Sequence, residues 1–196
     1  MTDEGYIKFE CEWEKARAFS NTKIDLLLQC RQSLYDHNLI GSYPDGIGFG
    51  NISIRESGNR FYISGTQTGS LPKLTQDHIT LVTDFDFEEN SLSCCGPIKA
   101  SSESLTHAAL YSSSNNVSAV VHVHSKNLWD KYLNQLPTTS ELIPYGTPEM
   151  AYAIMQLGQE LHEENSRIII MGGHPEGIIS FGESIQKVTD QLIELT

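Results

Sequence analysis

Hydrophobic and polar positions follow two different periods along this chain, which predicts strands and helices mixed throughout. Apolar residues three and four positions apart indicate a helix at 22–38, with Ile24, Leu27 and Leu34 on one face. Strict alternation or short β-branched runs indicate strands at 52–55, 61–63, 79–82, 117–123, 168–171 and 177–181. Further helical spacing appears at 102–112, 148–162 and 184–195, while segment 6–15 fits either a short strand or a helical lead-in. This mixture favours an α/β layered class, and a length of 196 residues fits one domain over 1–196.

A glycine-rich connection separates the first helix from the first clear strands. Gly41, Gly46, Gly48 and Gly50 lie within ten residues, together with Pro44. Glycine has no side chain and tolerates unusual backbone angles, so such a segment lets the backbone approach a ligand closely.

Charge and composition exclude several classes of partner. Hydrophobic residues make up 39% of the chain, enough for a packed core, and 13 basic against 25 acidic residues give a net charge of −12. An acidic surface repels nucleic-acid phosphates and anionic membranes, so we expect neither as a partner. No apolar run approaches the roughly 20 residues that span a bilayer. The acidic N-terminus shows no secretory signal, and the cysteines (Cys11, Cys30, Cys94, Cys95) form no disulfide or zinc-knot pattern, which predicts a cytoplasmic protein with reduced thiols.

Two histidines end the most apolar predicted strand, in Val120-Val121-His122-Val123-His124-Ser125. Residues i and i+2 project from the same face of a strand, so the two imidazoles can bind one metal ion. Catalytic Zn²⁺ takes three protein ligands and keeps one position open for substrate. The pattern alone leaves open the alternative of two histidines satisfied in the core.

His174 is the candidate for a third ligand. It lies in a loop between two predicted strands, flanked by Gly172-Gly173 and Pro175-Glu176-Gly177. A histidine among glycines in a connecting loop has little role in packing. The other four histidines are interpreted as structural or surface residues: His37, His78, His107 and His162.

Ser101, Ser102 and Glu103 open a predicted helix. Hydroxyl groups cap the free N–H groups of a first turn, and the helix dipole favours anions there. The segment could therefore cradle a phosphate, or it could be an ordinary helix cap followed by a first-turn acid.

Taken together, the segments resemble the class II aldolase/adducin family. Those that carry the resemblance, in order, are Gly50-Asn51-Ile52-Ser53-Ile54-Arg55, Ile63-Ser64-Gly65-Thr66, 101–111 and 119–125, closed by His174 and 177–182. The resemblance spans about residues 24–190. It implies a three-layer α/β/α sandwich around a mixed central sheet, in a homo-oligomer, commonly a tetramer with sites between neighbours.

The resemblance also assigns roles within the site. It implies that His122, His124 and His174 bind Zn²⁺ or another divalent transition metal and that Glu103 is the catalytic acid/base. The residues expected to hold the phosphate of a small sugar phosphate are Asn51, Ser64, Gly65, Ser101 and Ser102. The implied activity is that of a metal-dependent aldolase, a lyase that cleaves a small phosphorylated ketose through a metal-stabilised enediolate.

Three departures from the family pattern bear on this prediction. The family's third-histidine segment usually reads Asn-His-Gly, whereas here Pro175 and Glu176 separate His174 from the next glycine. Many phosphosugar aldolases carry a hydroxyl residue where this chain has Gly48. They also often use a C-terminal tyrosine as general acid, and the last tyrosine here is Tyr152, so the donor is unassigned, with Tyr145 as a candidate.

Other functions within the same resemblance stay open. A methylthioribulose-1-phosphate dehydratase would use a glutamate downstream of the histidine pair, for which Glu141 or Glu149 could serve. A pentulose-phosphate 4-epimerase usually has aspartate where this chain has Glu103. An adducin-like scaffold domain, which is not an enzyme, lacks the metal ligands altogether.

Overall fold

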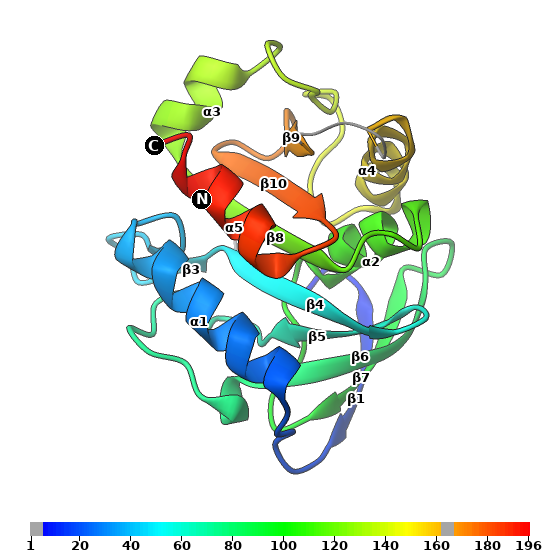
Figure 1. Ribbon diagram of the computed structural model, residues 1–196. Helices are drawn as coiled ribbons and strands as arrows, with labels where there is room; N and C mark the ends of the chain where they lie inside the picture. The colour runs from blue at the N-terminus through cyan, green and yellow to red at the C-terminus, as the bar shows by residue number, and fades with distance from the viewer. Residues whose placement is uncertain (1–5, 162–166) are drawn as a thin grey trace.

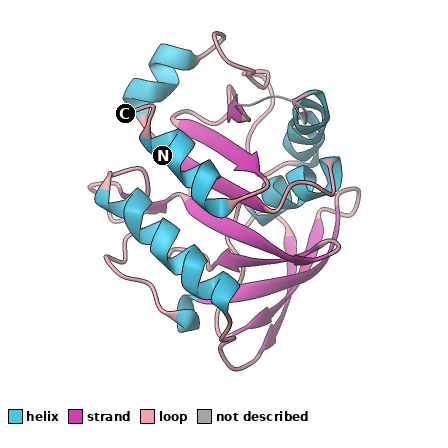
Figure 2. Cartoon of the chain, viewed as in Figure 1, coloured by secondary structure: helices cyan, strands magenta, loops and turns pink. Residues whose placement is uncertain are grey.

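The computed structural model describes residues 6–161 and 167–196, in which helices cover both faces of one large sheet (Figure 1, Figure 2). Within these residues the strands are β1 Glu10–Lys15, β2 Gly41–Ser42, β3 Gly48–Phe49, β4 Asn51–Ser57, β5 Arg60–Ser64, β6 Ile79–Asp86, β7 Ser91–Gly96, β8 Ala119–His124, β9 Ile168–Ile170 and β10 Gly177–Gly182. The helices are α1 Thr22–Asp36, α2 Ser104–Ser113, α3 Lys126–Tyr132, α4 Pro148–Glu160 and α5 Ile185–Ile193, with a 3₁₀ turn at Gln76–His78.

Eight of the described strands form a mixed sheet in the order β1-β7-β6-β5-β4-β8-β10-β9. The edge pair β1 and β7 is parallel, and the other neighbours are antiparallel. Strands β4, β8 and β10 therefore lie side by side near one end of the order, and β8 is buried along its whole length. The short strands β2 and β3 form a separate hairpin.

Two hydrophobic clusters occupy the opposite faces of the sheet. Alternate residues of β5 point into different clusters, with Phe61 in one and Tyr62 in the other. Leu110 of α2 and Ile154 of α4 belong to the first cluster, whereas α1 and α5 contribute to the second (for example Leu27 and Val188). This arrangement confirms the three-layer α/β/α sandwich (Figure 2).

Several element boundaries differ from the predictions. Helix α1 ends at Asp36 rather than 38 because Asn38 takes a left-handed backbone conformation, with φ of 57°, and the Leu39 N–H then bonds back to the Leu34 carbonyl. The ambiguous segment 6–15 contains a strand, β1. In the described part of the chain the helix predicted at 148–162 ends at Glu160, and residue 162 lies outside the described residues.

Strand β7 and helix α3 are absent from the predicted elements. Strand β7 consists of small and polar residues around Leu92 and Cys94, so its alternation carries little hydrophobic contrast. Helix α3 has seven residues, a length at which helical spacing is hard to recognise. None of the helices in the described ranges has both the length and the apolar character required to cross a bilayer.

Candidate metal centre

The histidine pair lies at the end of the central strand β8. In the sheet, His122 is opposite Asn51 of β4 on one side and Ile179 of β10 on the other. His124 is opposite Gly177, the first residue of β10. The Nε2 atoms of the two histidines lie 3.0 Å apart, so both rings project to the same side of the strand.

His174 reaches the pair from the turn that leads into β10. The Gly177 N–H donates to the His174 carbonyl at 2.9 Å, which closes a tight turn and places the imidazole over β8. The centroid of its ring lies 5.0 Å from that of His122 and 4.7 Å from that of His124. One ligand nitrogen from each histidine lies within 4.8 Å of the other two, and all three side chains are buried.

Burial keeps the paired imidazoles neutral. The pKa of His122 is held well below its usual value, first by burial and then by the neighbouring His124 and His174. Burial, followed by His174, lowers the pKa of His124 in the same way. A neutral imidazole has a free lone pair and is the form that binds a metal ion. Three imidazole nitrogens on a common centre fit Zn²⁺, and also other divalent transition metals that accept nitrogen ligands.

Glycine at position 177 leaves room for two of these rings. A Cβ atom there would lie 2.9 Å from the His174 carbonyl oxygen, 3.1 Å from Cγ of His174 and 3.2 Å from Cε1 of His122. These distances are shorter than ordinary van der Waals contact. The absent side chain is therefore part of what lets His122 and His174 converge.

Glu103 immediately precedes α2, and the packing of this helix along β4 positions it. The ring of Tyr111 lies beneath the Arg55 guanidinium, and His107 Nδ1 lies 2.7 Å from Ser53 Oγ. Four residues along a helix and two along a strand cover similar lengths. The same spacing carried one step further would pair Glu103 with Asn51.

Glu103 is 1% exposed. Its Oε2 atom accepts a hydrogen bond from Thr106 Oγ1 at 2.8 Å. Since Asn51 pairs with His122 in the sheet, the register of α2 directs Glu103 to the end of the sheet that carries the histidines.

The five residues expected to hold a phosphate come together where β4, β5 and α2 meet. The Ile52 N–H donates to Ser64 Oγ at 3.2 Å, which ties the start of β4 to the end of β5. Gly65 forms an isolated bridge with Ala100, directly before the serine pair. The side chains of Asn51, Ser64, Ser101 and Ser102 are buried. The carbonyl oxygen of the Asn51 side chain has no hydrogen-bond partner among the described residues.

The structure also places the other positions that the sequence brought into question. The Tyr145 ring stacks on that of His174, with 4.1 Å between centroids and 16° between planes. Glu141 and Glu149 are exposed, in contrast to Glu103. A Cβ atom at Gly48 would meet the Ser70 nitrogen at 3.1 Å, so this backbone packs too closely to accommodate a hydroxyl side chain without adjustment.

Two aromatic residues around His124 were missed by the sequence reasoning. The Tyr43 hydroxyl lies 2.7 Å from His124 Nδ1, and the Phe49 ring stacks on His124 with 5.4 Å between centroids. Both belong to the glycine-rich segment 41–50. That segment was expected to approach a ligand, and this was the signal that could have identified them.

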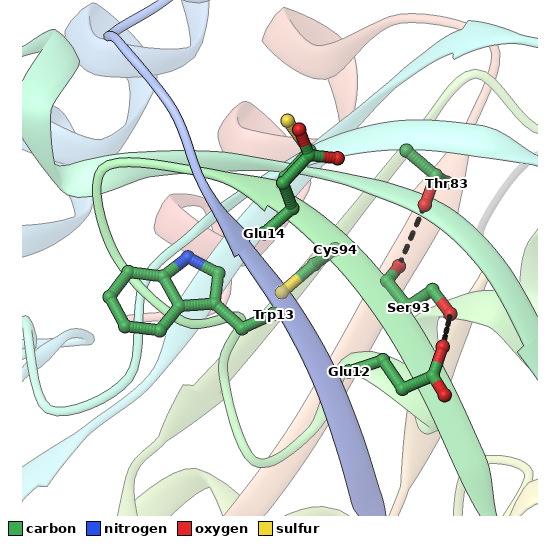
Figure 3. A pocket seen from close by; sticks show the side chains of 7 residues that line it. Glu12, Trp13, Glu14, Thr83, Ser93 and Cys94 are labelled. Carbon is green, nitrogen blue, oxygen red and sulfur yellow. Dashed lines mark hydrogen bonds between the residues drawn. The ribbon is translucent and has the colours of Figure 1, made fainter.

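An open hollow elsewhere on the molecule is separate from this centre. It has a volume of about 550 Å³ and is lined by residues of β1, β6 and β7, including Glu12, Trp13 and Cys94 (Figure 3). Some of its polar side chains are already engaged: Ser93 Oγ donates to Glu12, and Thr83 Oγ1 donates to the Ser93 carbonyl. Strands β5 and β4 lie between this edge of the sheet and β8.

Comparisons with known proteins agree with this architecture. The model of the class II aldolase and adducin N-terminal domain matches residues 26–196. The L-fuculose phosphate aldolase of Methanocaldococcus jannaschii is 29% identical over 170 residues, which cover 80% of this chain and 81% of that protein. The 3-oxo-tetronate 4-phosphate decarboxylase of Haemophilus influenzae is 31% identical over 137 residues, 69% of this chain but only 57% of the relative's length.

A solved structure shows the same fold. The L-fuculose-1-phosphate aldolase of Thermus thermophilus superimposes with a TM-score of 0.62, at 21% identity, and the match covers 87% of each chain. The order of the sheet, the helices on both faces and the match over residues 26–196 lead to one conclusion. The chain belongs to the class II aldolase and adducin N-terminal domain family.

Proposed function

We propose that this protein is a metal-dependent aldolase that cleaves a carbon–carbon bond in a small phosphorylated ketose. The observation that carries the proposal is the convergence of His122, His124 and His174, whose ligand nitrogens lie within 4.8 Å of one another at the end of the sheet to which α2 directs the buried Glu103. An ordinary protein core has no need of three buried imidazoles on a common centre. A catalytic divalent metal site requires such a set.

The three histidines and Glu103 have different proposed roles. A divalent metal bound by the three histidines would supply Lewis acidity toward the carbonyl and neighbouring hydroxyl oxygens of a substrate. Glu103 is the carboxylate suited to move the proton between substrate oxygen and carbon, because it is buried and held by Thr106. Exclusion of water around these groups strengthens every electrostatic interaction within the site.

The substrate phosphate is assigned to the neutral donors just before α2 and near the ends of β4 and β5. None of Asn51, Ser64, Gly65, Ser101 and Ser102 carries a charge. Backbone N–H groups and hydroxyls at a helix N-terminus are well suited to bind a phosphate dianion. This local arrangement would offset the repulsion from a net charge of −12. We further propose that the chain acts as a homotetramer, which its molar mass in solution would test.

A decarboxylase acting on a phosphorylated oxo-acid is the second candidate, favoured by the relative at 31% identity. Retro-aldol cleavage and decarboxylation both break a bond to the carbon next to a carbonyl. In both, the bonding electrons stay on that carbon. The same electrophilic stabilisation serves both reactions. They differ in the group that leaves, an aldehyde or CO₂.

The first experiment measures bound metal by elemental analysis of the purified protein. We expect about one divalent metal ion per chain, lost in both His122→Ala and His174→Ala. His37→Ala is the control, because this histidine is exposed and lies just after the end of α1. Metal lost only in His122→Ala would remove His174 from the ligand set. No metal in any form, even after Zn²⁺ is supplied, would favour an adducin-like role without catalysis.

The second experiment assigns the reaction with the metal-loaded protein. L-Fuculose 1-phosphate and 3-oxo-tetronate 4-phosphate are the probes, with released aldehyde and CO₂ measured separately. We expect Glu103→Gln to abolish turnover and the exposed Glu141→Gln and Glu149→Gln to retain it. Loss of turnover confined to Glu141→Gln or Glu149→Gln would instead assign the acid/base role to that glutamate, the position that the dehydratase alternative requires.

A further inference from the structure

A carboxylate, a phenol and an imidazole form a continuous hydrogen-bonded chain behind the candidate metal centre. The Tyr43 hydroxyl lies 2.7 Å from His124 Nδ1 and 3.0 Å from Glu176 Oε2. The opposite nitrogen of His124, Nε2, faces Nε2 of His122 at 3.0 Å. The three groups come from distant segments: Tyr43 from the β2–β3 hairpin, His124 from β8 and Glu176 from the turn before β10.

The direction of these hydrogen bonds follows from the group at their end, the carboxylate of Glu176. The Tyr43 O–H donates to Glu176 Oε2. The phenol oxygen is then left with lone pairs for His124, and the hydrogen between Tyr43 and His124 belongs to Nδ1. This places the proton of the neutral imidazole on Nδ1 and leaves the lone pair of Nε2 directed at the histidine cluster.

The local backbone is built to hold both partners in place. Glu176 has φ of 70°, a left-handed conformation that non-glycine residues rarely adopt, and its carbonyl accepts the Ser125 N–H at 3.0 Å. Tyr43 is fixed by its N–H bond to the Ile47 carbonyl at 2.9 Å. The Phe49 ring packs against both Tyr43 and His124, with 4.9 Å and 5.4 Å between ring centroids.

We infer that Tyr43 and Glu176 are positioning residues that fix the tautomer and orientation of His124 for metal binding. The residues inserted after His174 then have a role, because the turn through Pro175 and Glu176 brings a carboxylate to Tyr43. It rests on the proposed function only in that the cluster binds a metal. Removing such an outer partner of a metal-binding histidine costs about 10–100-fold in metal affinity.

The test measures Zn²⁺ affinity of the full chain by competition with a chelating dye. Tyr43→Phe keeps the ring and removes the hydroxyl, and we expect about 10–100-fold weaker binding. Glu176→Gln keeps an acceptor but removes the charge, so its loss should be smaller than that of Tyr43→Phe. The double variant should bind no worse than Tyr43→Phe alone, because both changes interrupt one chain. Tyr152→Phe, at an exposed tyrosine on α4, is the matched control and should bind as the unsubstituted protein does.

A second readout separates this inference from the proposed function. In the metal-free protein, ¹⁵N chemical shifts of His124 report directly which ring nitrogen carries the proton. We expect the Nδ1–H form in the unsubstituted protein and a mixture of tautomers in Tyr43→Phe. An Nε2–H form, or zinc affinity unchanged in Tyr43→Phe, would overturn the inference. Failure of the unsubstituted protein to bind Zn²⁺ would overturn the proposed function, while the ¹⁵N shifts would still decide the tautomer.

Discussion

At the scale of single residues, the missing side chain of Gly177 matters for this centre. Gly177 provides no ligand, yet His122 and His174 both lie against the space where its side chain would be. Gly182, at the other end of the same strand, has ordinary space: a Cβ atom there would have Val188 Cγ2 as its nearest neighbour, at 3.4 Å. The two glycines of β10 therefore form a natural pair for comparison.

We predict that Gly177→Ala lowers the free energy of unfolding of the metal-free protein by about 1–3 kcal/mol, the usual cost of overpacking. The same change should weaken Zn²⁺ binding, because the added methyl group pushes the His174 and His122 rings apart. Gly182→Ala should change stability by less than about 0.5 kcal/mol. Denaturant unfolding and zinc titration of both variants provide the measurement. Equal behaviour of the two would show that the rings adjust without cost.

At the scale of elements, the site depends on how α2 is registered against β4. Arg55, on β4, donates through Nη2 to the carbonyl oxygens of Tyr111 at 2.8 Å and Ser114 at 2.9 Å. Its Nε also donates to the Val117 carbonyl at 2.6 Å. One side chain therefore satisfies the carbonyls at the end of α2 and fixes that helix lengthwise. The other end of the helix follows Glu103.

We predict that Arg55→Met lowers the free energy of unfolding by about 2 kcal/mol, because carbonyls at the end of α2 lose a charged donor. Arg60→Met is the control: its ion pair with Glu56, at 3.6 Å, is exposed, and the change should cost less than about 0.5 kcal/mol. Chemical denaturation of both variants tests this. An equal and small effect would mean that packing alone sets the position of α2.

At the scale of the whole molecule, burial of histidines links folding to pH. His107 lies between α2 and β4 with no exposed surface, and burial lowers its pKa to about 3. The usual value, retained on unfolding, is about 6.5. Between these two values the unfolded chain binds more protons than the folded one, so stability falls as the pH drops below about 6.5. The same direction holds for His122 and His124.

We predict that His107 alone accounts for a loss of about 2 kcal/mol in the free energy of unfolding between pH 8 and pH 5. The measurement compares metal-free protein with His107→Gln by denaturant unfolding across this range. The difference between the two curves should shrink steadily toward acid pH, whatever the absolute cost of the substitution. A constant difference would mean that His107 has the same pKa in the folded and the unfolded protein.

Local periodicity determined much of this protein directly. The alternation around His122 and His124 requires both rings to leave one face of a strand, whatever that strand pairs with. The spacing of Ile24, Leu27 and Leu34 likewise defines the buried face of α1, and the structure confirms it. Motif order was enough to predict the family and its three-layer fold, both of which the comparisons and the sheet confirm.

Only the tertiary structure decided which distant residues share the site. Glu176 and Tyr43 are separated by 133 positions, and no periodicity relates them to His124. Their contact depends on the turn at His174–Gly177 and on the β2–β3 hairpin, both of which are set by side-chain packing and backbone angles rather than by hydrophobic pattern. Strand β7 was missed for a related reason: its pairing with β1 and β6 makes it a strand, and its own small residues do not. Sequence determined which residues could bind a metal, and the long-range packing of strands and turns decided what holds them in place.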